Sequence, residues 1–163
     1  LFISFGSGIS VVMGQYLGAN ELKEAKSAAP KMIFFSFVMC TVVGVVMACF
    51  AGVFPLAYNT IEEVRSLAKS FIFISAVFMP VHAMLNSSYF IMRSGGKTGI
   101  TFLFDCGFSW LMSVPLAYSL VNVTDLNIVM VYFCVQAAEV IKCIVGLLLI
   151  KKGIWLSNIV ADK

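Results

Sequence analysis

Apolar residues fill five long runs of this sequence, and short polar connectors separate the runs. The runs cover residues 1–17, 31–56, 69–92, 99–121 and 127–150. Stretches of about 18 or more mostly apolar residues with few charges are typical of transmembrane helices. The runs do not alternate apolar and polar residues with a period of two, as half-buried strands do. The pattern therefore predicts an all-α, polytopic membrane protein with five transmembrane helices.

The connectors carry local signals for helix ends. Asn20 is a candidate N-cap in the first connector, and Pro30 suits the first turn of the second span. Thr60 and Glu63 have the spacing of a capping box, which predicts a helix start before the third span. After the fifth span, Trp155 is a candidate interfacial anchor.

Composition agrees with a membrane protein. Of the 163 residues, 61% are hydrophobic and 12% are charged, whereas soluble domains average about 45–50% and about 25%. Because the bilayer core offers no water to backbone groups, helices must satisfy those groups internally. The five cysteines lie in apolar runs without CxxC or metal-like spacing, so we expect neither disulfides nor a metal site.

The basic residues predict the orientation in the membrane. Eight of the eleven lysines and arginines lie in the first and third connectors and in the tail, on one side of the predicted bundle. The opposite side carries Arg65 and Lys69, and Lys142 lies within the fifth span. The positive-inside rule therefore predicts that the basic side and the C-terminus are cytoplasmic. The net charge of +3 follows from this asymmetry, so no nucleic-acid partner is expected.

Small residues recur every four positions in the first two spans. One row is Gly6, Ser10, Gly14 and Gly18, and the other is Cys40, Gly44, Ala48 and Gly52. Such rows let helices approach closely, either as static packing or as a seam along which helices slide. Pro80 and Pro115 predict kinks in the third and fourth spans.

Three adjacent spans each carry a polar stripe at helical spacing. The stripes are Ser75, His82 and Asn86; Thr101, Asp105, Ser109 and Ser113; and Gln136, Glu139 and Lys142. Polar and ionisable residues inside membrane spans face the bundle interior or a wet cavity instead of lipid. The stripes therefore predict one shared interior, whose candidate ion-coupling or cavity residues are Asp105, His82, Asn86, Gln136, Glu139 and Lys142.

Each ionisable candidate also has a structural interpretation. Asp105 lies about 9 Å inside its span by helical rise. It is either a strut paired with Lys97 or Arg93, or a proton or cation site. Glu139 and Lys142 form either a structural ion pair at i, i+3 spacing or part of a coupling site. His82 is either a satisfied interior group or a proton carrier, since histidine titrates near pH 6.5.

Several segments resemble one transporter family. The segment "GQYLGANELKEAK" (residues 14–26) resembles the signature at the end of the second helix in each half of the multidrug and toxic compound extrusion (MATE) transporters. Its motif residues are Gly14, Gln15 and Gly18. The segment "MRSGGKTGITFLFD" (residues 92–105) is similar to a connector and following helix of that family, with motif residues Arg93, Gly95 and Gly96. "VPLAY" and "KKGIW" follow in the family's order.

The resemblance implies a fold of twelve helices in two six-helix halves. We expect residues 1–163 to be a partial C-terminal lobe, helices eight to twelve, of a longer chain. Proteins of that family alternate between inward and outward openings in the plasma membrane. They export drugs or organic cations in exchange for protons or sodium ions. The implied partners are the missing N-terminal half, membrane lipid and small organic cations. No cofactor is implied, and the coupling ion, H⁺ or Na⁺, stays open.

One position departs from the family pattern. Some members carry an acidic cation-site residue shortly after a proline on the tenth helix, whereas "FMPVHAM" has His82 at the comparable place. The coupling charge is therefore expected at Asp105, near Glu139 or in the missing half.

Two other functions stay open on the sequence. A flippase of lipid-linked oligosaccharides, in the same superfamily, usually has a broad cationic cavity, whereas Lys142 is the one cation expected at membrane depth. A non-transporting membrane assembly subunit is the second alternative. Catalysis is not expected, because the sequence has one histidine and neither HExxH nor GxSxG.

Overall fold

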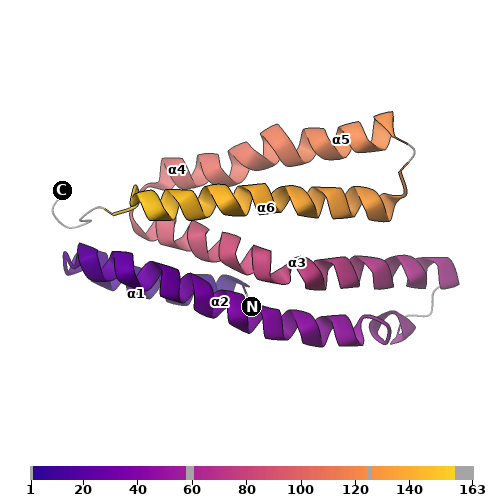
Figure 1. Ribbon diagram of the computed structural model, residues 1–163, viewed down its shortest axis with the longest axis horizontal. Helices are drawn as coiled ribbons and strands as arrows, with labels where there is room; N and C mark the ends of the chain where they lie inside the picture. Colours follow the sequence, from indigo (N-terminus) through magenta and orange to yellow (C-terminus); the bar gives the residue numbers. More distant parts are fainter. Residues whose placement is uncertain (1, 58–60, 125, 157–163) are drawn as a thin grey trace.

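The computed structural model describes residues 2–57, 61–124 and 126–156, and these residues form helices joined by short connectors (Figure 1). The elements are α1 (Phe2–Gly18), α2 (Leu22–Phe50), the short 3₁₀ helix η1 (Phe54–Ala57), α3 (Glu62–Ser94), α4 (Thr98–Phe102), the π-helical turns η2 (Leu103–Gly107) and η3 (Ser109–Ser113), α5 (Val114–Val123) and α6 (Ile128–Lys152). The described ranges contain no strand, and the all-α prediction is confirmed.

The predicted count of five membrane spans is wrong by one. Within the residues that the structure describes, four helical stretches are long and apolar enough to cross a membrane, namely α2, α3, the run from α4 to α5 (Thr98–Val123) and α6. The first helix, α1, has 17 described residues, and a crossing needs about 18 or more. The other predicted spans agree with these helices, although several ends differ.

The start of α2 differs from the prediction. The helix begins at Leu22 with Glu21 at the N-cap position, whereas Asn20 has a positive φ of 61° and ends the turn after α1. Pro30 lies inside α2 and not in its first turn. The preceding segment is rich in Ala, Leu, Glu and Lys, which are strong helix formers, so helix forms on both sides of the proline. Thr60 lies outside the described residues, and Ile61 holds the N-cap position of α3.

The fourth span is one continuous helical run that contains two π-helical turns, η2 and η3. Pro115 is the second residue of α5, directly after η3. Proline has no N–H to donate, and its ring crowds the carbonyl four residues earlier, at Leu111 in η3. A widened turn accommodates both effects, so the predicted disturbance takes the form of π turns.

The long helix α3 is the centre of the bundle. It packs against α1, α2 and α6, while the fourth span lies along α6 (Figure 1). Pro80 lies near the middle of α3, and Figure 1 shows the ribbon of this helix bending about halfway along. The polar stripe of α3 faces α6, since Ser75 contacts Tyr132 and His82 contacts Gln136 there.

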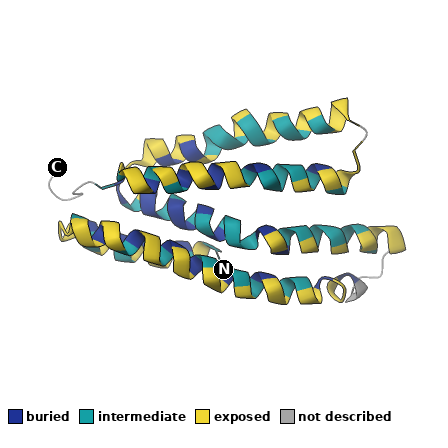
Figure 2. Ribbon diagram, viewed as in Figure 1, coloured by how far each residue is buried: buried dark blue, intermediate teal, exposed yellow. Residues whose placement is uncertain are grey.

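Burial is concentrated at the end of the bundle where α3 and α6 end. Figure 2 shows the buried residues gathered toward this end. The apolar core there includes Met13, Leu17, Ala29, Ile91, Met92, Ile150 and Trp155. Trp155 is 1% exposed, and its Nε1 donates to the carbonyl of Ile150. The prediction of an interfacial anchor at Trp155 is therefore wrong, because the turn after α6 folds back onto α3.

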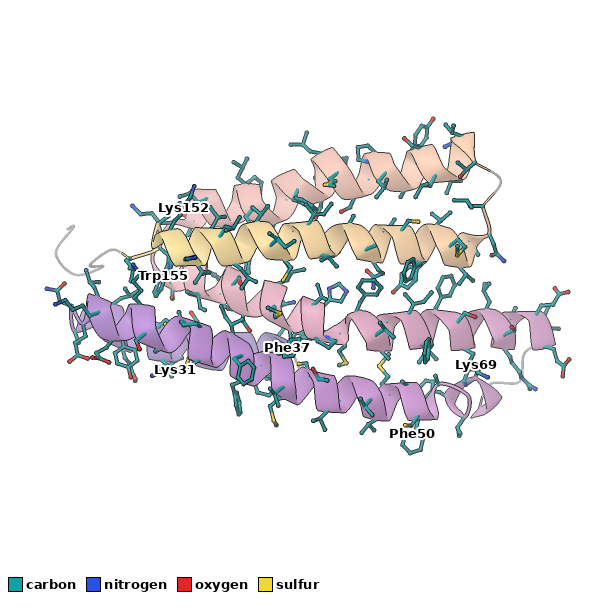
Figure 3. The ribbon with its side chains drawn as sticks, in the orientation of Figure 1. Lys31, Phe37, Phe50, Lys69, Lys152 and Trp155 are labelled. Atoms are coloured by element: carbon teal, nitrogen blue, oxygen red, sulfur yellow. The ribbon has the colours of Figure 1, made fainter. Side chains whose placement is uncertain are left out.

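The same end carries most of the basic residues, and we call it the basic end. Figure 3 shows Lys31 and Lys152 toward this end and Lys69 at the other. The end contains the α1–α2 and α3–α4 connectors and the last turn of α6. The alternation of connectors thus places the charges as the sequence predicts, and the membrane side that each end faces stays a prediction.

Two of the predicted small residues allow close helix contact. A Cβ at Gly6 would overlap the ring of Phe90, and a Cβ at Gly44 would lie 2.7 Å from the carbonyl oxygen of Ala76. These glycines let α1 and α2 approach α3. By contrast, a Cβ at Gly14 or Gly18 would meet no atom of the described structure within 4 Å. The two rows therefore act as packing surfaces only in part.

Candidate functional site

An ion pair links the fourth span to α6. Lys142 Nζ donates to Asp105 Oδ1 at 2.7 Å. Asp105 lies in the π-helical turn η2. Lys142 lies in the second half of α6 and is 6% exposed. The predicted partners of Asp105, Lys97 or Arg93, are therefore wrong, because tertiary packing places a lysine from a sequence-distant helix beside the carboxylate.

A second carboxylate lies close to the same lysine. Glu139 Oε2 is 4.0 Å from Lys142 Nζ, at the predicted i, i+3 spacing. Ser113, from η3, donates its hydroxyl to Glu139 Oε1 at 3.3 Å. Two acidic side chains thus share one ammonium group, and Asp105 makes the shorter contact. We call Asp105, Glu139, Lys142 and Ser113 the ion cluster.

Aromatic rings and solvent exposure make the ion cluster asymmetric. Lys142 Nζ lies 5.6 Å from the ring centre of Phe104 and 5.9 Å from that of Phe108. Such distances allow cation–π attraction. The side chain of Asp105 is 53% exposed, while that of Glu139 is 15% exposed. Asp105 is therefore the more accessible of the two carboxylates.

A second group of polar side chains connects α3 with α6. Gln136 Nε2 donates to His82 Nε2 at 3.3 Å and to the hydroxyl of Tyr132 at 3.2 Å. That hydroxyl lies 2.8 Å from Ser75 Oγ, within hydrogen-bond distance. We call Ser75, His82, Tyr132 and Gln136 the histidine chain. These hydrogen bonds hold the imidazole of His82 beside the ion cluster.

One cavity joins the two groups. It has a volume of about 280 Å³, and its lining includes His82, Asn86, Asp105, Glu139 and Lys142. Five of the six candidate coupling or cavity residues therefore meet at a single hollow, and the sixth, Gln136, contacts His82. Their roles in ion coupling stay predictions.

Two further hollows adjoin this cavity. One of about 350 Å³ shares His82 and Asn86 with it and extends past Ser75 and Tyr132. The other, of about 340 Å³, shares Tyr89 and Asp105 and extends to Arg93 at the basic end. Together they form a row of hollows along α3. The amide of Asn86 donates to the carbonyl of His82, so this residue lines the row while bonded to its own helix.

The motif residues lie at the basic end, outside the ion cluster. Gly14, Gln15 and Gly18 lie in the last turns of α1, and Gln15 and Gly18 are exposed. Gly96 has a φ of +73°, which favours glycine, and it turns the chain from α3 into α4. A Cβ at Gly95 would overlap the carbonyl oxygen of Trp155. These residues shape connectors and packing, and Arg93 also lines the hollow that extends to the basic end.

Sequence reasoning missed Tyr132 and the aromatic side chains around Lys142. Tyr132 lies four residues before Gln136, so it extends the polar stripe of α6 by one helical turn. This four-residue spacing could have identified Tyr132 as a site residue from the sequence. Across the described ranges, no group of three or more His, Cys, Asp or Glu residues could hold a metal ion.

Comparisons with known proteins agree with the family resemblance found in the sequence. The sequence profile of a family described as MatE matches residues 1–119. A probable multidrug resistance protein NorM from Oceanobacillus iheyensis is 24% identical over 125 residues, which cover 77% of this chain and 28% of that relative. A probable multidrug resistance protein NorM from Halalkalibacterium halodurans is 21% identical over 125 residues, covering 77% of this chain and 27% of the relative. No solved structure matches the chain.

Proposed function

The chain belongs to the MatE family of multi-pass membrane proteins, and we propose that it is part of a secondary active antiporter that exports drugs or organic cations in exchange for protons or sodium ions. The chain spans about 28% of the length of a curated relative that it matches. The remaining helices of the transport path, including the N-terminal half, would come from the rest of the protein. The proposed location is the plasma membrane, with the basic end and the C-terminus in the cytoplasm.

One observation carries this proposal, namely a lysine held between two carboxylates in a membrane-depth cavity. Lys142 contacts Asp105 at 2.7 Å and Glu139 at 4.0 Å. Ionisable groups are costly inside a membrane and mark ion or substrate pathways. Two carboxylates with one ammonium leave one negative charge uncompensated when all three are ionised. A cavity with that charge attracts cations and protons.

Competition between Lys142 and an incoming proton or cation for Asp105 provides the exchange step. A proton, a sodium ion or an organic cation that binds Asp105 replaces Lys142 as its counter-ion. Lys142 is then free to move closer to Glu139, one helical turn away on α6. The link between η2 and α6 is thereby broken. Because a ligand shifts a conformational equilibrium only through its different affinity for the two states, this broken link is the means by which binding changes the preferred opening.

The histidine chain supplies a second titratable group beside the cluster. His82 lines the same cavity as Asp105 and Glu139. An imidazole can accept a proton at one ring nitrogen and release it again. His82 is therefore the proposed proton carrier on α3, at the place where the resemblance implies an acidic residue in some family members.

The flippase alternative has less support. A broad cationic cavity needs ammonium or guanidinium groups that are free to bind phosphate. In the described part of the cavity the ammonium of Lys142 is bound to Asp105, and the other charged lining residues are acidic. A non-transporting assembly role would not explain why paired charged residues line the cavity.

Transport by the intact protein tests the proposal. In everted membrane vesicles, a fluorescent organic cation is followed while a proton or a sodium gradient is imposed. We expect Asp105→Asn to reduce gradient-driven transport on the order of tenfold or more, because the switchable counter-ion of Lys142 is lost. The matched control is Glu24→Gln, an exposed carboxylate in the first turn of α2 at the basic end. Unchanged rate and ion dependence in Asp105→Asn would reject the coupling role of this residue.

A further inference from the structure

We propose that a groove between α2 and α6 at the basic end binds an anionic phospholipid, with an acyl chain in the groove and the phosphate at Lys26 and Lys151. The groove lies apart from the ion cluster and shares no lining residue with its cavity. This site is independent of the transport reaction proposed above.

The groove has the size and lining of a site for a hydrocarbon chain. Its volume is about 520 Å³, within the range of about 300–1,000 Å³ that small-ligand pockets occupy. The apolar lining comes from three helices: Ile33, Phe34 and Phe37 of α2, Met84 of α3, and Leu147 and Ile150 of α6. Phe37 is labelled in Figure 3. The lining is thus a continuous apolar trough.

Charge is confined to one end of the groove. Lys26 lies near the start of α2 and Lys151 in the last turn of α6, and both line the groove. Neither lysine forms a salt bridge within the described residues. The aromatic and aliphatic residues lie farther along the helices. A phospholipid has the same arrangement, with a charged phosphate at one end and apolar chains beyond it.

The surroundings identify the occupant as lipid. Phe34 is 67% exposed on α2, and Leu148 is 52% exposed on α6, so the groove opens onto an apolar surface. In a multi-pass membrane protein such a surface faces acyl chains or another helix. An apolar helix would leave two lysines at the mouth without an anion. An anionic phospholipid satisfies both lysines, as headgroups do in basic pockets between membrane helices.

Fluorescence quenching by brominated lipids tests the site in the intact protein. The reporter is Phe34→Trp in a Trp110→Phe background, because Trp110 is 74% exposed whereas Trp155 is buried. Phosphatidylcholine vesicles contain a small fraction of either brominated phosphatidylglycerol or brominated phosphatidylcholine. We expect phosphatidylglycerol to quench the Phe34→Trp reporter several-fold more strongly. The matched reporter is Phe35→Trp, which is exposed on α2 at the same depth but lies outside the groove. It should respond equally to both lipids.

Charge variants identify the headgroup contact. Combining Lys26→Gln with Lys151→Gln should remove most of the several-fold preference for phosphatidylglycerol, because both contacts to the headgroup are lost. The control combines Lys23→Gln with Lys152→Gln, which removes the same charge from the basic end outside the groove. If a variant fails to fold, added salt should reduce the preference of the reporter protein itself, since salt screens exposed charges. Equal quenching by both lipids, no quenching at position 34, or an equal loss in the control pair would each overturn the proposal.

Discussion

At the basic end, α1, α2, α3 and α6 bury large side chains against one another, and Met13, Leu17, Ile91 and Trp155 are at most 1% exposed. Toward the other end of the bundle, fewer side chains are buried between the helices. Among the described residues, α3 has no buried side chain before Ala76, and α5 has none along its length. Figure 2 shows the same contrast along the bundle. Both regions are highly apolar, so composition does not explain the difference.

The packing among α1, α2, α3 and α6 at the basic end and the attachment of the fourth span to α6 depend on different forces. The basic end is held by apolar packing and by glycines that let backbones touch, neither of which depends on protonation. The fourth span is held to α6 in part by charged and polar contacts, namely Asp105 with Lys142 and Ser113 with Glu139. Such contacts respond to protons and cations. The packed end is therefore suited to stay constant while the fourth span changes its attachment.

The largest expected change in stability comes from Trp155, and substitution of the other tryptophan, Trp110, provides the comparison. Trp155→Ala should lower the free energy of unfolding by about 3–5 kcal/mol, as removal of a buried aromatic side chain does. Trp110→Ala should change it by less than about 0.5 kcal/mol, because Trp110 is 74% exposed. Thermal unfolding of the intact protein in detergent measures both. Similar losses from the two variants would contradict the difference between the regions.

The next prediction tests whether the ion pair between Asp105 and Lys142 helps to hold the fourth span to α6. A double-mutant cycle of Asp105→Asn and Lys142→Gln should give a coupling energy of about 1–2 kcal/mol. The value is modest because half of the Asp105 side chain is exposed. The cycle uses the same unfolding measurement, and the pair Asp105→Asn with Glu24→Gln provides an uncoupled reference. A coupling energy near zero would mean that the contact between Asp105 and Lys142 does not help to hold the fourth span to α6.

The polar stripes show how much of the site the sequence could predict. Helical spacing placed His82, Asp105 and Glu139 on interior faces, and the structure brings them to one cavity. The predicted Glu139–Lys142 pair at i, i+3 spacing is present, but the partner of Asp105 was assigned wrongly. Spacing along a helix tells which residues share a face, but the facing residue of another helix depends on rotation and register. Lys142 lies 37 residues from Asp105, so local sequence gave Lys97 and Arg93 instead.

The helix ends show a similar limit. Pro30 is a good signal for the first turn of a helix, yet α2 begins eight residues earlier, at Leu22. Propensity of the preceding residues outweighed the single proline. Trp155 beside two lysines is a good signal for the membrane interface, but the turn after α6 brings its backbone close to Gly95 and buries its side chain in the apolar core. In both cases a strong local signal was overridden by the surrounding chain.

The smallest effect tests whether water reaches the ion cluster. Cys106 follows Asp105 and lines a hollow with it, whereas Cys143 follows Lys142 and is 6% exposed. The thiolate is the reactive form, and a buried thiol is inert. In variants that retain one cysteine each, a water-soluble methanethiosulfonate reagent should therefore modify Cys106 on the order of tenfold faster than Cys143. Cys40, which is also buried, provides the slow reference. Equal rates at Cys106 and Cys40 would mean that the hollow beside Asp105 is dry, and proton or cation exchange at that carboxylate would lose its route.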